Sequence, residues 1–178
     1  VGNFHGGPRH FLAIEKACRK VQRRHGLAMV SLFSLMIARL TQGTSNLDDV
    51  LGAVEGVDRA WLDGDTPGGV VETSQPLALH GDWADPEYKS LPRQTVDSWL
   101  AAKGHSRKEK HPKGLPAMIR AFRATQQFFL AETYTGTPAV ASAELGERFL
   151  DLLGSRAAEG VTELLDGTIG PEDCRSPI

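Results

Sequence analysis

Three stretches of the sequence combine residue types that could carry chemistry. In the first, Asn3-Phe4-His5-Gly6-Gly7, a histidine is followed by two glycines and by the start of a predicted helix. Glycines allow backbone or ligand to approach closely, and a helix N-terminus favours anions. A histidine at the end of a buried strand lies where open α/β sheets keep their ligands. The same residues could instead form a tight strand-to-helix turn, in which His5 merely hydrogen-bonds a carbonyl.

The second stretch is Gly68-Gly69-Val70-Val71-Glu72-Thr73-Ser74. Glu72 falls at the start of a predicted helix, where the helix dipole favours a carboxylate, and helix capping alone would explain both Glu72 and Thr73. The third stretch, His80-Gly81-Asp82-Trp83-Ala84-Asp85-Pro86-Glu87, offers the ligand types of a divalent metal. Loops of this composition are more often solvated turns.

The elements that must position these stretches follow from apolar spacing. Phe11, Ile14, Cys18 and Val21 recur every three or four residues, which predicts a helix over 8–24. The run 27–33 is nearly all apolar, as a strand buried on both faces should be. Together they read as the back half of a βαβ unit, and we expect the chain to be the C-terminal portion of a longer protein. Further helices are predicted over 47–54, 72–79, 92–103, 115–132 and 141–165, with a loose tail over 167–178.

Composition sets the outer limits on function. The 178 residues suit one domain, and 40% apolar with 24% charged residues is ordinary for a globular protein. A net charge of −2 argues against a nucleic-acid partner and against a membrane surface. No apolar run approaches the roughly 20 residues that span a bilayer. Two cysteines, Cys18 and Cys174, do not make a disulfide scaffold, so a cytoplasmic protein is expected.

A family resemblance joins these stretches. The run 3–7 resembles the Asn-Gly-His-Gly-Gly motif of the creatininase-type amidohydrolases, and 68–74 is similar to the second part of their His-Gly-Gly-x-x-Glu-Thr-Ser motif. Near the end, Thr135-Gly136-Thr137-Pro138 followed by Ala141, Glu144 and Gly146 resembles the segment that opens the family's last helix. The three motifs occur in the family's order and cover most of the chain.

The resemblance implies a fold and a reaction. The fold would be an α/β domain over 1–178, a three-layer α/β/α arrangement with a mostly parallel central sheet, assembled as a homo-oligomer that is a hexamer in the family. The reaction would be hydrolysis of a non-peptide C–N bond in a small-molecule amide by water held between two divalent ions, zinc or manganese. By the same resemblance His5 is a metal ligand. The residues expected to support the site are Asn3, Gly6, Gly7, Glu72, Thr73 and Ser74.

The sequence also departs from the family pattern. The family's catalytic histidine corresponds to Pro67, and the glutamate that some members place before it corresponds to Thr66. Asp65 is the nearest titratable residue and is the candidate catalytic group. The family's Glu-x-His pair and aspartate ligand would precede His5, outside this chain. The chain is therefore predicted to be a divergent metal-dependent amidohydrolase or, alternatively, a non-catalytic binding or assembly subunit. An unrelated α/β domain that binds a nucleotide phosphate at the helix start after Gly7 is a third reading.

Overall fold

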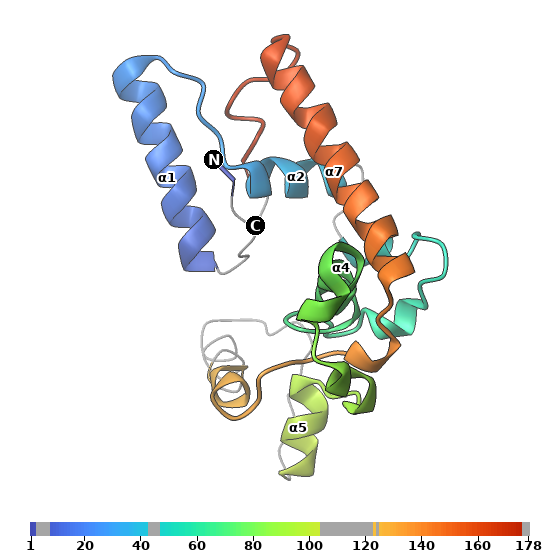
Figure 1. The fold of residues 1–178 in the computed structure, drawn as a ribbon. Coiled ribbons are helices and arrows are strands. Elements are labelled where there is room, and N and C mark those ends of the chain that lie inside the picture. Colours follow the sequence, from blue (N-terminus) through green and yellow to red (C-terminus); the bar gives the residue numbers. More distant parts are fainter. Residues whose placement is uncertain (3–7, 43–46, 104–122, 124, 176–178) are drawn as a thin grey trace. The chain divides into compact units, whose positions relative to one another are not determined.

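The computed structural model describes residues 1–2, 8–42, 47–103, 123 and 125–175 (Figure 1). Within these ranges the regular structure is entirely helical. The longer helices, in chain order, are α1 (Pro8–His25), α2 (Leu32–Leu40), α3 (Leu47–Leu51), α4 (Val70–His80), α5 (Val96–Ala102), a helical segment over 125–131 and α7 (Ala143–Leu165). Short 3-10 helices, η1 (Arg59–Trp61), η2 (Gly81–Trp83), η3 (Pro86–Ser90) and η4 (Pro138–Val140), connect them.

The predicted α/β fold is wrong for the part of the chain that the structure describes. That part contains no β-strand; its nearest approach to one is an isolated antiparallel bridge between Gln94 and Gly136. The central sheet of the predicted three-layer α/β/α domain is therefore absent from the described residues. The helices predicted over 8–24 and 141–165 are confirmed as α1 and α7. Those predicted over 47–54 and 72–79 correspond to α3 and α4 with shifted ends, and the helix predicted over 92–103 is confirmed only over α5.

The error began at the predicted strand over 27–33. Its first residues have no regular structure, and its end forms the start of α2. Ser31 caps this helix, since its hydroxyl accepts a hydrogen bond from the Ser34 N–H at 3.3 Å. The apolar residues also continue beyond Phe33 to Leu40, and this longer run buries a helical face. A short apolar run cannot by itself distinguish a buried strand from a helix.

The chain divides into two compact units, Val1–Val50 with Leu150–Ile178 and Leu51–Phe149. The core of the first unit centres on Met36, Ile37 and Leu40 of α2. The partly buried side chains packed on this core are Phe33, Leu47, Val50, Leu152, Leu153 and Ala157. The Phe11 ring of α1 lies 6.1 Å from the Phe33 ring, centre to centre, so α1 is held to α2 by aromatic packing.

Close contacts tie α7 to α2 within this first unit. A Cβ at Gly160 would come within 2.7 Å of the Leu35 side chain, so the absence of a side chain permits this approach. Arg39 and Glu163 form an ion pair between the same two helices. Cys18 and Cys174 both belong to this unit and are buried free thiols. Burial raises the pKa of each thiol, so both are protonated near neutral pH.

The second unit is built around Phe128 and Phe149, both fully buried. The Trp99 ring of α5 meets the Phe128 ring edge-on at 5.8 Å between centres. At the start of α7, Gly146 lies directly against the Ser74 backbone and the Ala78 side chain of α4. The contact with Gly146 holds the middle and end of α4, and the motif 68–74 lies at the beginning of the same helix. Among the described helices, none is both long enough and apolar enough to span a bilayer.

Candidate functional site

Asp65 lies at the centre of the turn that precedes α4. Its side chain is 5% exposed, and its two carboxylate oxygens accept hydrogen bonds from the N–H groups of Val70 at 2.6 Å and Val71 at 3.0 Å. The residue at the usual capping position is Gly69, which has no side chain to offer. Asp65 therefore caps the helix from four residues further upstream, satisfying donors that the first turn of any helix leaves free.

The protonation of Asp65 reflects this buried position. Burial, the largest influence, raises the pKa of the carboxyl above its usual value, while N–H donors from Val71, Val70 and Thr137 oppose the rise. A raised pKa is a common property of catalytic carboxyls. Here, however, both oxygens are already engaged by backbone N–H groups of the same helix. Asp65 is consequently placed to hold α4 and is poorly placed to reach a substrate.

Two glycines pack directly on Asp65. A Cβ built at Gly69 or at Gly136 would overlap Asp65 side-chain or backbone atoms. Gly68 and Gly136 also have φ of +79° and +88°, in the left-handed region that favours glycine. The turn around Asp65 and the segment carrying Gly136 thus touch without an intervening side chain.

Thr135 joins the same two segments by hydrogen bonds. Its N–H donates to the Pro67 carbonyl at 2.8 Å, and its hydroxyl donates to the Gly64 carbonyl at 2.7 Å. The segment 64–67, which precedes the motif 68–74, therefore lies against the segment that begins the third family-like motif at Thr135. The Thr135–Pro67 hydrogen bond joins the two through backbone atoms.

The remaining motif residues also contact backbone. Glu72 accepts a hydrogen bond from the Gly68 N–H at 2.8 Å, and the Thr73 hydroxyl donates to the Gly68 carbonyl at 3.1 Å. The Ser74 hydroxyl, fully buried, accepts from the Ser142 N–H at 3.2 Å. The Glu72 contact matches the capping interpretation, whereas the Thr73 hydroxyl bonds a carbonyl and satisfies no free N–H group of the helix. The motif stabilises the start of α4 and attaches it to the segment that leads into α7.

The proposed metal ligand cannot be placed in the same way. Asn3, His5, Gly6 and Gly7 lie outside the described residues, and so does most of the helix predicted over 115–132. Among the residues that are described, no three His, Cys, Asp or Glu side chains gather closely enough to hold a metal ion. Within the described ranges, therefore, the available donors do not form a site for zinc or manganese.

The acidic loop after α4 has a different arrangement from that of a metal site. The His80 ring stacks on the Trp83 ring at 4.1 Å between centres, and Trp83 is 76% exposed. The Asp85 carboxylate accepts a hydrogen bond from the Glu87 N–H at 2.9 Å and thereby starts η3. The arrangement of 80–87 agrees with a solvated turn rather than with a metal site.

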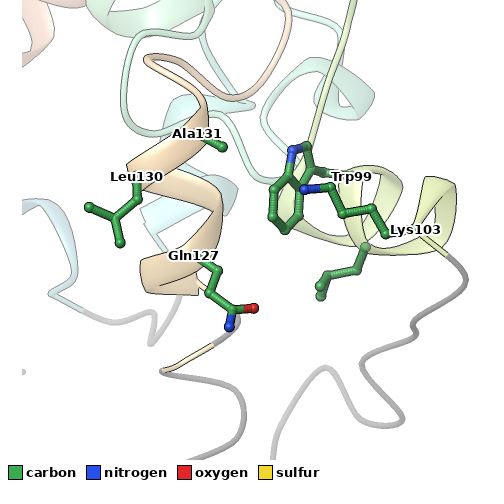
Figure 2. Close-up of a pocket in the computed structure, with 6 residues that line it drawn as sticks. Trp99, Lys103, Gln127, Leu130 and Ala131 are labelled. Atoms are coloured by element: carbon green, nitrogen blue, oxygen red, sulfur yellow. The ribbon is translucent and has the colours of Figure 1, made fainter.

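A pocket that the sequence did not indicate lies between α5 and the segment 125–131. Its volume is about 350 Å³, and Figure 2 shows Trp99 and Lys103 opposite Gln127, Leu130 and Ala131. The Lys103 ammonium sits 3.5 Å from the centre of the Trp99 ring, and the indole N–H donates to Glu132 at 3.0 Å. Leu130 is 89% exposed. The lining is mainly apolar and contains no acid–base pair, so it is suited to contact rather than to catalysis.

Comparisons with known proteins leave the chain unassigned. No protein-family model, no curated protein and no solved structure matches it. The likeness to the creatininase-type family therefore rests on the three short motifs alone.

Proposed function

We propose that this chain is a cytoplasmic, non-catalytic binding or assembly subunit. The observation that supports this most is the use of the Asp65 carboxylate: both of its oxygens accept backbone N–H groups of α4. A general base must reach the proton that it removes, and a metal ligand must offer a free lone pair in the right direction. With proline and threonine at the two positions where the family has proton-transfer residues, Asp65 was the remaining candidate.

A metal-dependent amidohydrolase would hold zinc or manganese tightly, whereas a non-catalytic subunit would not. We expect less than about 0.1 equivalent of zinc or manganese per chain after dialysis, because a site of this kind needs about three protein ligands. We also expect no hydrolysis of creatinine or of another small cyclic amide. Elemental analysis of the purified chain, with and without added metal, measures the first quantity.

One tightly held metal ion per chain would contradict this proposal. The His5→Ala variant then identifies the ligands: loss of metal would restore the family site, while retention would point to the loop containing His80, Asp82 and Asp85. Ser155→Ala, at an exposed position of α7 that is far in the sequence from every candidate ligand, serves as the matched control for handling losses.

Assembly is the second part of the proposal. The expectation of a homo-oligomer rested on the resemblance to the creatininase-type family, for which no match was found. The support is now a different one: the stretch 27–30 is irregular, and Leu27 at its start is 60% exposed. Burying the Leu27 side chain against a second copy of the chain would remove apolar surface from water.

Light scattering at micromolar concentration tests the assembly. We expect a mass above that of one chain, and a shift toward the monomer in Leu27→Asp because a charge opposes burial at an interface. Leu165→Asp is the control, since Leu165 is 82% exposed at the end of α7. A monomeric wild-type protein, or equal effects of the two substitutions, would rule out an interface at 27–33.

A further inference from the structure

Helix α1 concentrates positive charge that the whole-chain composition conceals. Six Lys or Arg residues occur within its 18 residues, at positions 9, 16, 19, 20, 23 and 24, against the single acidic residue Glu15. The net charge of the complete chain is nevertheless −2. The small net charge of the chain is therefore the sum of a strongly basic α1 and an acidic remainder.

The helix separates its apolar and cationic residues onto different sides. Phe11 and Cys18 are buried, 2% and 4% exposed, on the side that packs in the first unit. Lys16, Lys20 and Arg23 are exposed and follow the i, i+4, i+7 spacing that places side chains on one face. Arg24 is exposed beside them. At a rise of 1.5 Å per residue these four cations extend over about 12 Å of helix.

These cations are not compensated by neighbours in the structure. In the ranges that the structure describes, no ion pair involves Lys16, Lys20, Arg23 or Arg24, whereas Arg39, Arg93, Arg148 and Arg156 elsewhere each have at least one. Basic residues in a last turn stabilise a helix through its dipole, which accounts for Arg23 and Arg24. Lys16 and Lys20 lie too far from the C-terminus for this effect.

The exposed face suits a polyanion better than a protein or a bilayer. Protein interfaces depend on aromatic or large apolar anchors, whereas the exposed residues on and beside this face are Ala13, Ala17 and a single large apolar residue, Leu12, which is 46% exposed. An amphipathic helix that enters a membrane surface needs its apolar side free, and that side of α1 is occupied by Phe33 and its neighbours. A row of unpaired Lys and Arg along one helix face is the electrostatic pattern of nucleic-acid binding.

We propose that the exposed cationic face of α1, formed by Lys16, Lys20, Arg23 and Arg24, binds the phosphate backbone of nucleic acid. We expect this binding to be largely independent of base sequence, because contacts to phosphates carry no sequence information. The proposal of a non-catalytic subunit rests on Asp65, and the nucleic-acid proposal rests on α1. An experiment can therefore contradict either proposal without contradicting the other.

Fluorescence anisotropy of a labelled 20-base-pair duplex, titrated with the full chain at 50 and 200 mM NaCl, tests the inference. Four neutralised phosphates predict a slope of log K against log salt near −3.6, which corresponds to roughly a hundredfold weaker binding at the higher salt. The triple variant Lys16→Gln, Lys20→Gln, Arg23→Gln should bind at least about tenfold more weakly, with a slope nearer −1. Circular dichroism confirms that the variant keeps its helices.

A charge-matched control removes three exposed cations elsewhere, through Lys89→Gln, Arg123→Gln and Arg175→Gln. Its affinity should stay within about twofold of wild type. An equal loss in the control, or absence of duplex binding by the wild type at 50 mM salt, overturns the proposal. If the chain binds phosphatidylserine vesicles and not the duplex, and the triple α1 variant abolishes that binding, the proposal is overturned in favour of a membrane surface.

Discussion

Gly69→Ala is expected to destabilise the second unit by more than about 3 kcal/mol, the upper range for forcing an extra group into a packed site. The added Cβ would overlap both the carboxylate and the backbone carbonyl of Asp65. The Asp65 carboxylate cannot move away without losing its hydrogen bonds from the N–H groups of Val70 and Val71. Urea denaturation followed by tryptophan fluorescence measures the loss.

Gly81→Ala is the matched control for this substitution, because Gly81 lies in the same unit as Gly69. A Cβ at Gly81, which has helical φ and ψ at the end of α4, meets nothing within 4 Å. Alanine is a better helix former than glycine by roughly 0.5–1 kcal/mol, so this variant should be as stable as wild type or more so. A Gly69→Ala protein within about 0.5 kcal/mol of wild type would mean that the turn around Asp65 is not packed as described.

Asp65→Ala should destabilise the chain by about 2–3 kcal/mol, the cost of leaving buried donors without an acceptor. The donors are the N–H groups of Val70 and Val71, which lose both carboxylate oxygens at once. Asp58→Ala is a fair control, since Asp58 caps η1 in the same manner but is exposed. Water can replace an exposed cap, so its loss should cost no more than about 1 kcal/mol.

The pH dependence of Asp65→Asn tests the same assignment without removing the side chain. Because burial raises the folded pKa above the ordinary 3.8, the folded state holds the proton more tightly than the unfolded state. The stability from this proton is complete below about pH 3.8 and is lost as the pH rises through the folded pKa. Wild type should therefore lose stability relative to Asp65→Asn over that window. A constant difference between the two proteins would contradict a buried, titrating Asp65.

Periodicity predicted the helices whose apolar residues extend over several turns. Phe11 and Cys18 mark the buried face of α1, and Thr95 marks the start of α5 through a capping box with Ser98. The prediction was wrong at α2, because the continuous apolar run beginning at Leu27 is typical of a buried strand and shows no helical periodicity. Ser31 was the local signal against it, since serine before an apolar run is a typical helix start.

The candidate site was predictable in its local part. The position of Glu72 in the first turn of a helix follows from its neighbours, and its hydrogen bond to the Gly68 N–H spans four residues. The contact of Thr135 with Gly64 joins residues 71 positions apart, and no pattern near either one indicates the other. Capping of α4 by Asp65 was missed because caps are normally sought immediately before the helix.

The distribution of two rare residue types gives each unit its own spectroscopic reporter. Both cysteines, Cys18 and Cys174, are buried in the first unit, while all three tryptophans, Trp61, Trp83 and Trp99, belong to the second. A thiol reagent added to the native chain therefore reads local opening of the first unit, and indole emission reads the second, with no label or substitution required. Comparing the two signals along one denaturation curve separates a single cooperative transition from two independent ones.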